Sequence, residues 1–344
     1  MKPLLPLAAL FALTLIVGTH IASATEYPLP PENSRLIGEN STYVVPADNR
    51  SLEQIAADYK IGLLGMLEAN PGTDPWLPKA GSQLTIPTQM LLPDTKREGI
   101  VINLAELRLY YYPRGENKVI VYPIGIGQLG ANTPTMVTSI SQKIPNPSWT
   151  PTENIRKRYA KQGITLPGTV PAGPNNPMGL FALRLARGTG QYLIHGTNAD
   201  FGIGMRVSSG CIRLRPVDIE ALFNNVPNGT RVQVINQPLK YATEPDGKRY
   251  IEVHQPLSHS ESDDPQTMAI ALSKSASGFI HSQHSDTPLI GKAIERRSGM
   301  PVLVNRGEQV DEHTPLPEII QQQGAVTPIR QPATISQAVS ESVP

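Results

Sequence analysis

Between residues 42 and 88, apolar positions change from strand spacing to helix spacing and back. Residues 43–45 form a short apolar run that favours a strand. Ser51 is a typical helix N-cap, and the apolar side chains after it recur at helical spacing, at Leu52, Ile55, Ala56 and Tyr59. A second helix is predicted over 62–69 and a closing strand over 83–87. The pattern predicts a small α+β module with the order strand–helix–helix–strand.

From residue 97 to 238, β-branched and aromatic runs alternate with turns. One helix is predicted at 216–224, with Pro216 near its start and acidic residues in its first turn. Such spacing predicts a mainly β domain, an antiparallel sandwich or barrel-like fold. The predicted strands are Gly99–Leu104, Leu107–Tyr112, Lys118–Gly127, Thr135–Gln142, Gly179–Leu185, Tyr192–His195 and Arg231–Ile235.

A long segment rich in proline and glycine, residues 144–177, interrupts these strands. Loops of this length inside a compact domain are usually functional lids or disordered. We interpret the segment as a lid over the site described below, with plain disorder as the alternative. Its basic residues could hold carboxylates of a bound peptide; they are Arg156, Lys157, Arg158 and Lys161.

The two ends of the chain differ from its centre. Lys2, an apolar run over 4–17 and the small residues before Thr25 predict a secretory signal peptide, residues 1–24, cleaved after Ala24. The apolar run is too short for a membrane span, so we expect an exported protein with none. Residues 25–41 are predicted to be an extended lead-in.

Beyond the mainly β domain, residues 239–306 are predicted to be a partly folded C-terminal extension. It contains a hairpin over 241–253, a helix over 289–296 and a strand over 300–304. Residues 307–344 are polar without periodicity, which predicts a disordered tail.

Charge and cysteine content narrow the function. Lys and Arg total 30 against 29 Asp and Glu, a net charge of +1 that argues against nucleic-acid binding. The chain has one cysteine, Cys211. A single cysteine in an exported protein cannot form an internal disulfide and is open to oxidation, so we expect it to have a use. The alternative is an inert cysteine buried as a small hydrophobe.

Cys211 has one possible imidazole partner in its domain. His195 is the only histidine between residues 97 and 238. A thiol with an ordinary pKa near ~8.5 is mostly neutral at pH 7. An imidazole activates it either by taking its proton or by pairing with the thiolate as a cation. We therefore predict that Cys211 is a nucleophile and His195 its base.

The neighbours of Cys211 suit acyl chemistry. Gly210 allows a backbone turn in which successive N–H groups form an oxyanion hole. Arg213 lies on the same side of a strand as Cys211 and could bind a carboxylate or phosphate, with a surface salt bridge as the alternative. One cysteine and one histidine are too few for a zinc site. The glycines of residues 125–130 lack the strand–helix–strand context of a dinucleotide fingerprint, so we expect no metal and no cofactor.

Two stretches carry a family resemblance. His195-Gly196-Thr197 followed by Ser208-Ser209-Gly210-Cys211-Ile212-Arg213-Leu214 resembles the signature of L,D-transpeptidases with a YkuD-type catalytic domain. Residues 42–88 resemble a LysM module, which binds glycans such as peptidoglycan, although residues 45–50 depart from its usual first turn; the alternative is a spacer without a ligand. Together they resemble the Gram-negative periplasmic branch that attaches Braun lipoprotein to peptidoglycan.

The resemblance implies a two-step acyl transfer. Cys211 would attack the carbonyl of the third residue, meso-diaminopimelate, of a peptidoglycan stem tetrapeptide and expel D-alanine. An amine would then take the acyl group, and the branch favours the C-terminal lysine of Braun lipoprotein. Cross-linking of two stem peptides, or hydrolysis that trims tetrapeptides or releases lipoprotein, would share the same thioester. The remote alternative is a non-catalytic wall-binding protein.

The resemblance also assigns the supporting residues. His195 would assist Cys211 while its other ring nitrogen is held by a backbone carbonyl, that of Gly196. Gly196, Thr197, Ser209, Gly210 and Arg213 would line the oxyanion or substrate site. Many members have histidine at the position of Ser209, so that accessory contact is missing here. The thiol is expected to react with carbapenems, the module to hold glycan strands, and the catalytic domain to fold without residues 42–87.

Overall fold

The computed structural model describes residues 24–188, 192–199 and 201–307. The predicted signal peptide up to residue 23 and the predicted tail from residue 308 lie outside the described residues. In the described part, no helix has both the length and the apolar character needed to cross a bilayer.

A nine-stranded sheet forms the centre of the mainly β domain. It curls at β10, whose first half pairs with β15 and whose second half pairs with β11 across an irregularity between Ile140 and Gln142. The mainly β prediction is confirmed, but the pairing is mixed, because β6–β15 and β12–β14 are parallel. In spatial order the strands are β1 (Thr25–Pro28), β8 (Lys118–Pro123), β7 (Arg108–Tyr112), β6 (Gly99–Asn103), β15 (Arg231–Ile235), β10 (Met136–Pro145), β11 (Phe181–Leu185), β12 (Leu193–His195) and β14 (Ile212–Arg213).

Both faces of this sheet are buried. Ile100 and Ile102 of β6 join one apolar core, and Val101 between them joins another on the opposite face. Helix α4 (Pro216–Asn225) covers the first face through Ile219 and Leu222. Burial on both faces explains why these strands are continuous apolar runs rather than alternating ones. Two short strands, β9 (Ile126–Gly127) and β13 (Arg206–Ser208), pair with each other in a separate two-stranded sheet.

The module has the predicted order of elements. β3 (Ser41–Val44) pairs antiparallel with β4 (Gln83–Ile86), and α1 (Leu52–Asp58) and α2 (Leu63–Ala69) lie between them in the chain. Ser51 caps α1 in a reciprocal pair of hydrogen bonds with Gln54. The lead-in is extended and adds β1 to the edge of the large sheet, while β2 (Leu36–Ile37) pairs with β5 (Met90–Leu91).

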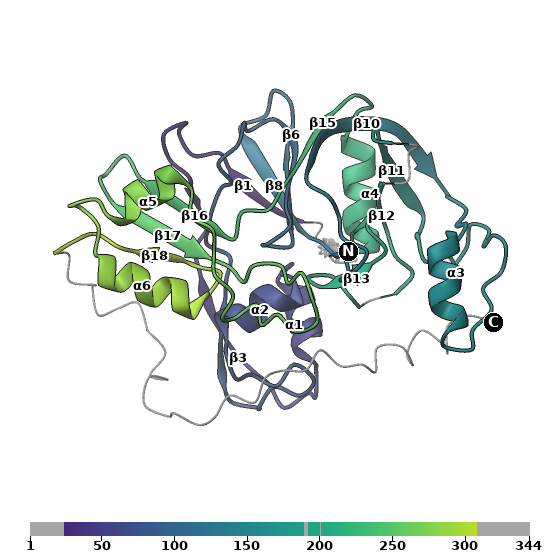
Figure 1. Cartoon of the computed structure of the whole chain (residues 1–344), viewed down its shortest axis with the longest axis horizontal. Coiled ribbons are helices and arrows are strands. Elements are labelled where there is room, and N and C mark those ends of the chain that lie inside the picture. Colours follow the sequence, from purple (N-terminus) through teal and green to yellow (C-terminus); the bar gives the residue numbers. More distant parts are fainter. Residues whose placement is uncertain (1–23, 189–191, 200, 308–344) are drawn as a thin grey trace, which may run out of the picture.

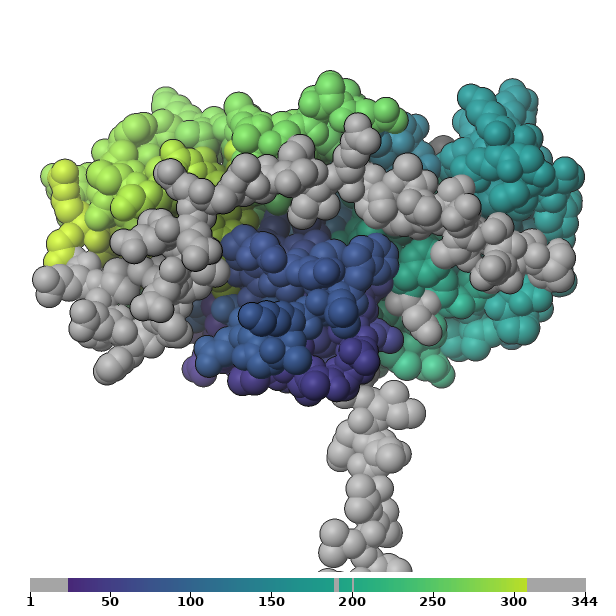
Figure 2. All heavy atoms as spheres, turned by 90° about the horizontal axis from the view of Figure 1, so that it is seen from below, coloured from purple at the N-terminus to yellow at the C-terminus, as the bar shows by residue number. Residues whose placement is uncertain are grey.

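The C-terminal extension is folded. β16 (Leu239–Thr243), β17 (Arg249–Val253) and β18 (Pro301–Leu303) form an antiparallel sheet, packed against α5 (Lys274–Ile280) and α6 (Thr287–Arg296). The hairpin, the second helix and the last strand match the predicted elements, whereas α5 was not predicted. Figure 2 shows the module, in blue and purple, between the extension in green and yellow and the teal part of the catalytic domain.

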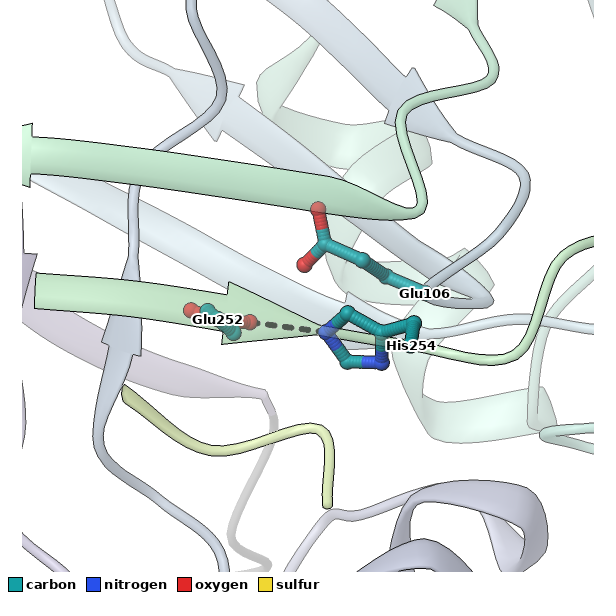
Figure 3. A group of neighbouring side chains, drawn as sticks. All are labelled: Glu106, Glu252 and His254. Carbon is teal, nitrogen blue, oxygen red and sulfur yellow. Dashed lines mark hydrogen bonds and ion pairs between the residues drawn. The ribbon is translucent and has the colours of Figure 1, made fainter. Parts of the chain in front are cut away.

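Six buried ionisable side chains meet where these three parts join, and we call them the junction cluster: Glu68, Glu106, Arg108, Lys240, Glu252 and His254. Lys240 Nζ lies 2.9 Å from a carboxylate oxygen of Glu106 and 2.9 Å from one of Glu252. Arg108 Nη1 lies 3.1 Å and 3.3 Å from the same two carboxylates. Figure 3 shows Glu106, from the turn after β6, near Glu252 and His254 at the end of β17.

His254 connects the cluster to the module. Its Nε2 lies 2.8 Å from Glu252 Oε1 and its Nδ1 lies 2.9 Å from Glu68 Oε2. Burial by itself lowers the pKa of His254, but the carboxylates of Glu68 and Glu252 outweigh it and raise the pKa to about 9. With His254 protonated, three carboxylates face three cations, so the cluster is electrically balanced.

The module is therefore not an independent unit. Glu68 also accepts a hydrogen bond of 2.8 Å from the Gln255 backbone N–H. The N–H groups of Leu63 and Leu64, at the start of α2, donate to the carbonyls of Ile203 and Gly204 in the catalytic domain. Deleting residues 42–87 would leave a buried, charged His254 without Glu68, which argues against the expectation that the catalytic domain folds without the module.

Lys240→Ala should destabilise the protein strongly. It leaves two buried carboxylates with only Arg108 of the two cations that they share, and removing one partner of a buried ion pair costs about 3–5 kcal/mol. Lys248→Ala is the matched control, because Lys248 pairs with Asp246 at the exposed end of the same hairpin and should lose at most about 1 kcal/mol. Urea unfolding measures both, and equal losses would contradict a structural role for the cluster.

Candidate active site

The sheet brings the two predicted catalytic residues onto one face. β12 and β14 are parallel neighbours, with Ile194 opposite Ile212 and His195 opposite Arg213. Side chains alternate between the faces of a sheet, and the fully buried Ile194 and Ile212 face the core. His195 and Arg213 therefore share the other face, together with Cys211 two residues before Arg213. Cys211 lies directly before β14, so this register brings its backbone near that of His195, and the contact between their side chains stays a prediction.

His195 is held as a neutral imidazole. Its ring is buried, and Nδ1 lies 2.6 Å from the carbonyl oxygen of Gly196, the contact that the resemblance implied. Because a carbonyl can only accept, Nδ1 carries the proton and Nε2 keeps its lone pair. Burial and then the nearby Arg213 cation lower the pKa of His195 to about 4, against smaller opposing effects of backbone carbonyls. The imidazole is thus uncharged at neutral pH.

Cys211 is held as a neutral thiol. Burial raises its pKa, and this outweighs a backbone hydrogen bond at Leu193 and the Arg213 cation, both of which lower it. Of the two modes of activation that the sequence left open, these directions favour proton transfer from thiol to imidazole during attack over a resting thiolate–imidazolium pair.

Two buried hydroxyls shape the turn that presents Cys211. Ser208 Oγ donates to the Cys211 carbonyl and accepts from the Gly210 N–H at 3.2 Å. Thr133 Oγ1 donates to the Gly210 carbonyl at 2.9 Å. Gly210 has φ +109°, which favours glycine. Its N–H points to Ser208 in this conformation, so the oxyanion role of Gly210 stays a prediction.

Sequence reasoning missed both hydroxyls. Ser208 lay inside the quoted motif but had no assigned role. Thr133 is 77 residues from Gly210 along the chain, and no local pattern could have connected them.

Gly196 and Thr197 support the His195 strand. A side-chain carbon on Gly196 would lie 2.9 Å from Ile219 Cγ2, so glycine allows α4 to approach β12. Thr197 is buried, and its Oγ1 accepts a hydrogen bond of 3.1 Å from the Ala199 N–H. These contacts give both residues a structural role, and their contact with a substrate stays a prediction.

Arg213 offers a cation with an unused donor. Its backbone pairs with Gly125 through two hydrogen bonds of 2.8 Å, which fix the strand. Its buried Nε has no hydrogen-bond partner within the described ranges, and none of the salt bridges found there includes Arg213. The alternative of a surface salt bridge is therefore not seen in this part of the chain. A half-buried guanidinium beside Cys211 suits a substrate carboxylate.

The predicted lid segment contains a helix that the sequence reasoning missed. α3 (Glu153–Ala160) begins at the N-cap Thr152, and Trp149 and Val170 bridge its two flanks. Figure 1 shows α3 standing beyond the strands that carry the site. Arg158 Nη2 reaches from α3 to Ser209 Oγ at 2.9 Å. The sequence offered two signals of this helix, the N-cap Thr152 and the i,i+4 pair of Glu153 and Lys157. It offered no apolar periodicity, because only Ile155 of the helix is buried.

In the described part of the chain, one group of possible metal ligands lies in the junction cluster, away from this site. Ligand atoms of Glu106, Glu252 and His254 all lie within 4.8 Å of one another. The ammonium of Lys240 already lies 2.9 Å from both carboxylates. A divalent cation there would face Lys240 and Arg108 at close range, so charge disfavours a metal at this position.

Comparisons with known proteins agree with the arrangement. A family described as "L,D-transpeptidase catalytic domain" matches residues 97–234, and one described as "L,D-transpeptidase C-terminal domain" matches residues 238–304. The chain is 59% identical over 295 residues to an Escherichia coli protein named "Probable L,D-transpeptidase YcfS", covering 85% of this chain and 92% of the relative. It is 54% identical over 304 residues to "Probable L,D-transpeptidase ErfK/SrfK" of E. coli, covering 87% and 97%.

One similar solved structure is the catalytic domain of an L,D-transpeptidase from E. faecium acylated by ertapenem. It is 20% identical, and the match covers 42% of this chain and 100% of that chain with a TM-score of 0.30. At this TM-score the likeness adds no argument to the sequence matches.

His195→Gln should abolish most turnover while hardly moving the pH profile of Cys211 alkylation. A positioned general base contributes about 10²–10⁴-fold to the rate, whereas a neutral imidazole leaves the thiol pKa nearly unchanged. Iodoacetamide labelling from pH 5 to 10, followed by mass, measures the profile, with the exposed His284→Gln as control. A wild-type labelling rate that stays constant between pH 5 and 8, and that loses this plateau in His195→Gln, would instead establish a resting pair of Cys211 thiolate and His195 imidazolium.

Proposed function

Because this chain belongs to the L,D-transpeptidase family, we propose that it acts on peptidoglycan in the periplasm. The donor is a stem tetrapeptide, and the attacked carbonyl belongs to its third residue, meso-diaminopimelate. The observation that supports the proposal most is the register of β12 and β14, in which His195 pairs with Arg213, two residues after Cys211, while burial keeps His195 neutral.

The proposed chemistry has two half-reactions. Cys211 Sγ attacks the donor carbonyl as His195 Nε2 takes the thiol proton, and backbone N–H groups of the 208–211 turn are expected to hold the developing oxyanion. His195 then gives its proton to the nitrogen of the departing D-alanine, which leaves a thioester. An amine attacks the thioester, His195 takes a proton from that amine, and the thiolate leaves and is reprotonated.

We propose that the preferred acceptor is the C-terminal lysine of Braun lipoprotein. The combination of an export signal, a LysM-like module and this catalytic domain resembles the anchoring branch and supports that choice. Stem-to-stem cross-linking and hydrolysis use the same thioester and differ only in what attacks it. Carbapenems should acylate Cys211, because their strained carbonyl imitates the acyl donor.

The LysM-like module is proposed to hold glycan strands. A pocket lies between its first turn, at Pro46, Ala47, Asn49 and Arg50, and the segment 77–80. Beside it Trp76 is 69% exposed and Leu77 is 54% exposed. An exposed aromatic ring next to a mostly apolar pocket with a few polar side chains fits the apolar face of a sugar ring.

The acceptor choice predicts a product. With disaccharide-tetrapeptide as donor and a lysine-terminated peptide added at equal concentration, the amide to the lysine peptide should predominate in the mass spectrum. Omitting the peptide should reveal how much stem-to-stem dimer or trimmed tripeptide forms from the same thioester. Predominant dimers in the competition would reject lipoprotein anchoring and leave the transpeptidase reaction standing.

Trp76→Ala should weaken retention on peptidoglycan sacculi without affecting thioester formation. Losing an aromatic contact of about 0.5–1.5 kcal/mol corresponds to roughly 2- to 10-fold weaker binding. Val137→Ala is the control, since Val137 is 66% exposed on the catalytic domain. Co-sedimentation with sacculi gives both values, and unchanged retention of the Trp76 variant would make the module a spacer.

A further inference from the structure

The basic residues of the lid segment have different surroundings. The Arg156 guanidinium donates to three carbonyls of its own loop, including those of Pro167 at 3.0 Å and Gly168 at 2.7 Å. Lys157 Nζ lies 2.6 Å from Glu153 one turn earlier on the helix, where both are exposed. Arg156 therefore stabilises the lid internally, and Lys157 points to solvent.

Arg158 is the member of this group that reaches the active site. Its Nη2 donates to Ser209 Oγ, two residues before Cys211. Its guanidinium lies 5.9 Å from the ring centre of Tyr159, whose hydroxyl interacts electrostatically with Arg213. Across the described residues, no salt bridge involves Arg158 or Arg213. Two guanidiniums thus approach Cys211, one from the lid and one from the sheet, and neither has a carboxylate partner there.

The donor of the proposed reaction brings such a carboxylate. Its scissile amide joins the third residue to a terminal D-alanine, so a carboxylate lies only three bonds from the attacked carbon. A carboxylate forms a stronger, charge-assisted hydrogen bond with a guanidinium than a serine hydroxyl does. An arriving donor can therefore draw Arg158 away from Ser209.

We propose that Arg158 is the specificity-determining residue that recognises the terminal carboxylate of the donor peptide, with Ser209 as its resting partner. This inference rests on the proposed function. When D-alanine leaves, the anion leaves with it, and Arg158 returns to Ser209.

A double-mutant cycle tests the contact. The donors are the tetrapeptide and the same peptide with a C-terminal amide; the enzymes are wild type and Arg158→Gln. A hydrogen bond to a charged group is worth about 1.5–3 kcal/mol, or roughly 10- to 150-fold in kcat/KM. We expect wild type to lose about that factor on the amide, Arg158→Gln to lose it on the acid, and the variant to make little distinction between the donors.

Three further variants separate recognition from a structural effect. Arg158→Lys should restore part of the preference for the acid, and Lys157→Gln, at the neighbouring exposed position, should behave as wild type. Ser209→Ala removes the resting partner and should keep the preference. If Arg158 only braced the loop, Ser209→Ala would instead reproduce the Arg158→Gln loss, and that result would overturn the proposal.

The remaining outcomes are equally decisive. If amidation of the donor and Arg158→Gln each lower kcat/KM and their fold-losses multiply in the combination, Arg158 does not contact the carboxylate. That result would overturn the proposal and leave the reaction intact. A wild-type protein that forms no thioester with either donor, yet remains folded, would overturn the proposed function itself.

Discussion

The arrangement of the whole molecule depends on burying six charges in one place. Lys240 lies between Glu106 and Glu252, and His254 lies between Glu252 and Glu68. Buried charges are costly unless every partner is present. The module supplies Glu68, the sheet supplies Glu106 and Arg108, and the extension supplies the rest. The three parts therefore stabilise one another, and none can move away without leaving an uncompensated charge.

This constraint extends to the active site. The module holds the 202–204 loop, since Glu53 accepts a 2.9 Å hydrogen bond from the Gly202 N–H and the start of α2 donates to the next two carbonyls. Gly202 lies against Arg213, because a side-chain carbon there would be 3.7 Å from Arg213 Nη1. The module that we propose holds glycan thus contacts the loop that lies against Arg213. A spacer on a flexible linker would not have these contacts.

Local pattern was enough to predict much of the fold and to nominate a candidate catalytic pair. Apolar runs located the large strands, Ser51 marked the first helix, and the scarcity of cysteine and histidine singled out Cys211 and His195. Features that depend on distant residues were not accessible. Glu106 lies in a predicted turn, and only a partner such as Lys240, 134 residues later by numbering, explains its burial. α3 buries only Ile155 and so shows no apolar period, whereas α5 buries Ala276, Phe279 and Ile280 at helical spacing, a signal that the sequence reasoning overlooked. Parallel pairing of β12 with β14 is not encoded in either strand alone.

The central claim is that Cys211, with a neutral His195 as base, forms the acyl-enzyme. To test this directly, the enzyme is incubated with the tetrapeptide donor and no acceptor, quenched with acid, and analysed by intact mass and peptide mapping. A parallel incubation with a carbapenem supplies an acyl group that hydrolyses more slowly. We expect an added mass equal to that of the donor less D-alanine, located on the peptide that contains Cys211. We expect no added mass in Cys211→Ala. An adduct of equal occupancy in Cys211→Ala, or one located on another residue, would contradict it.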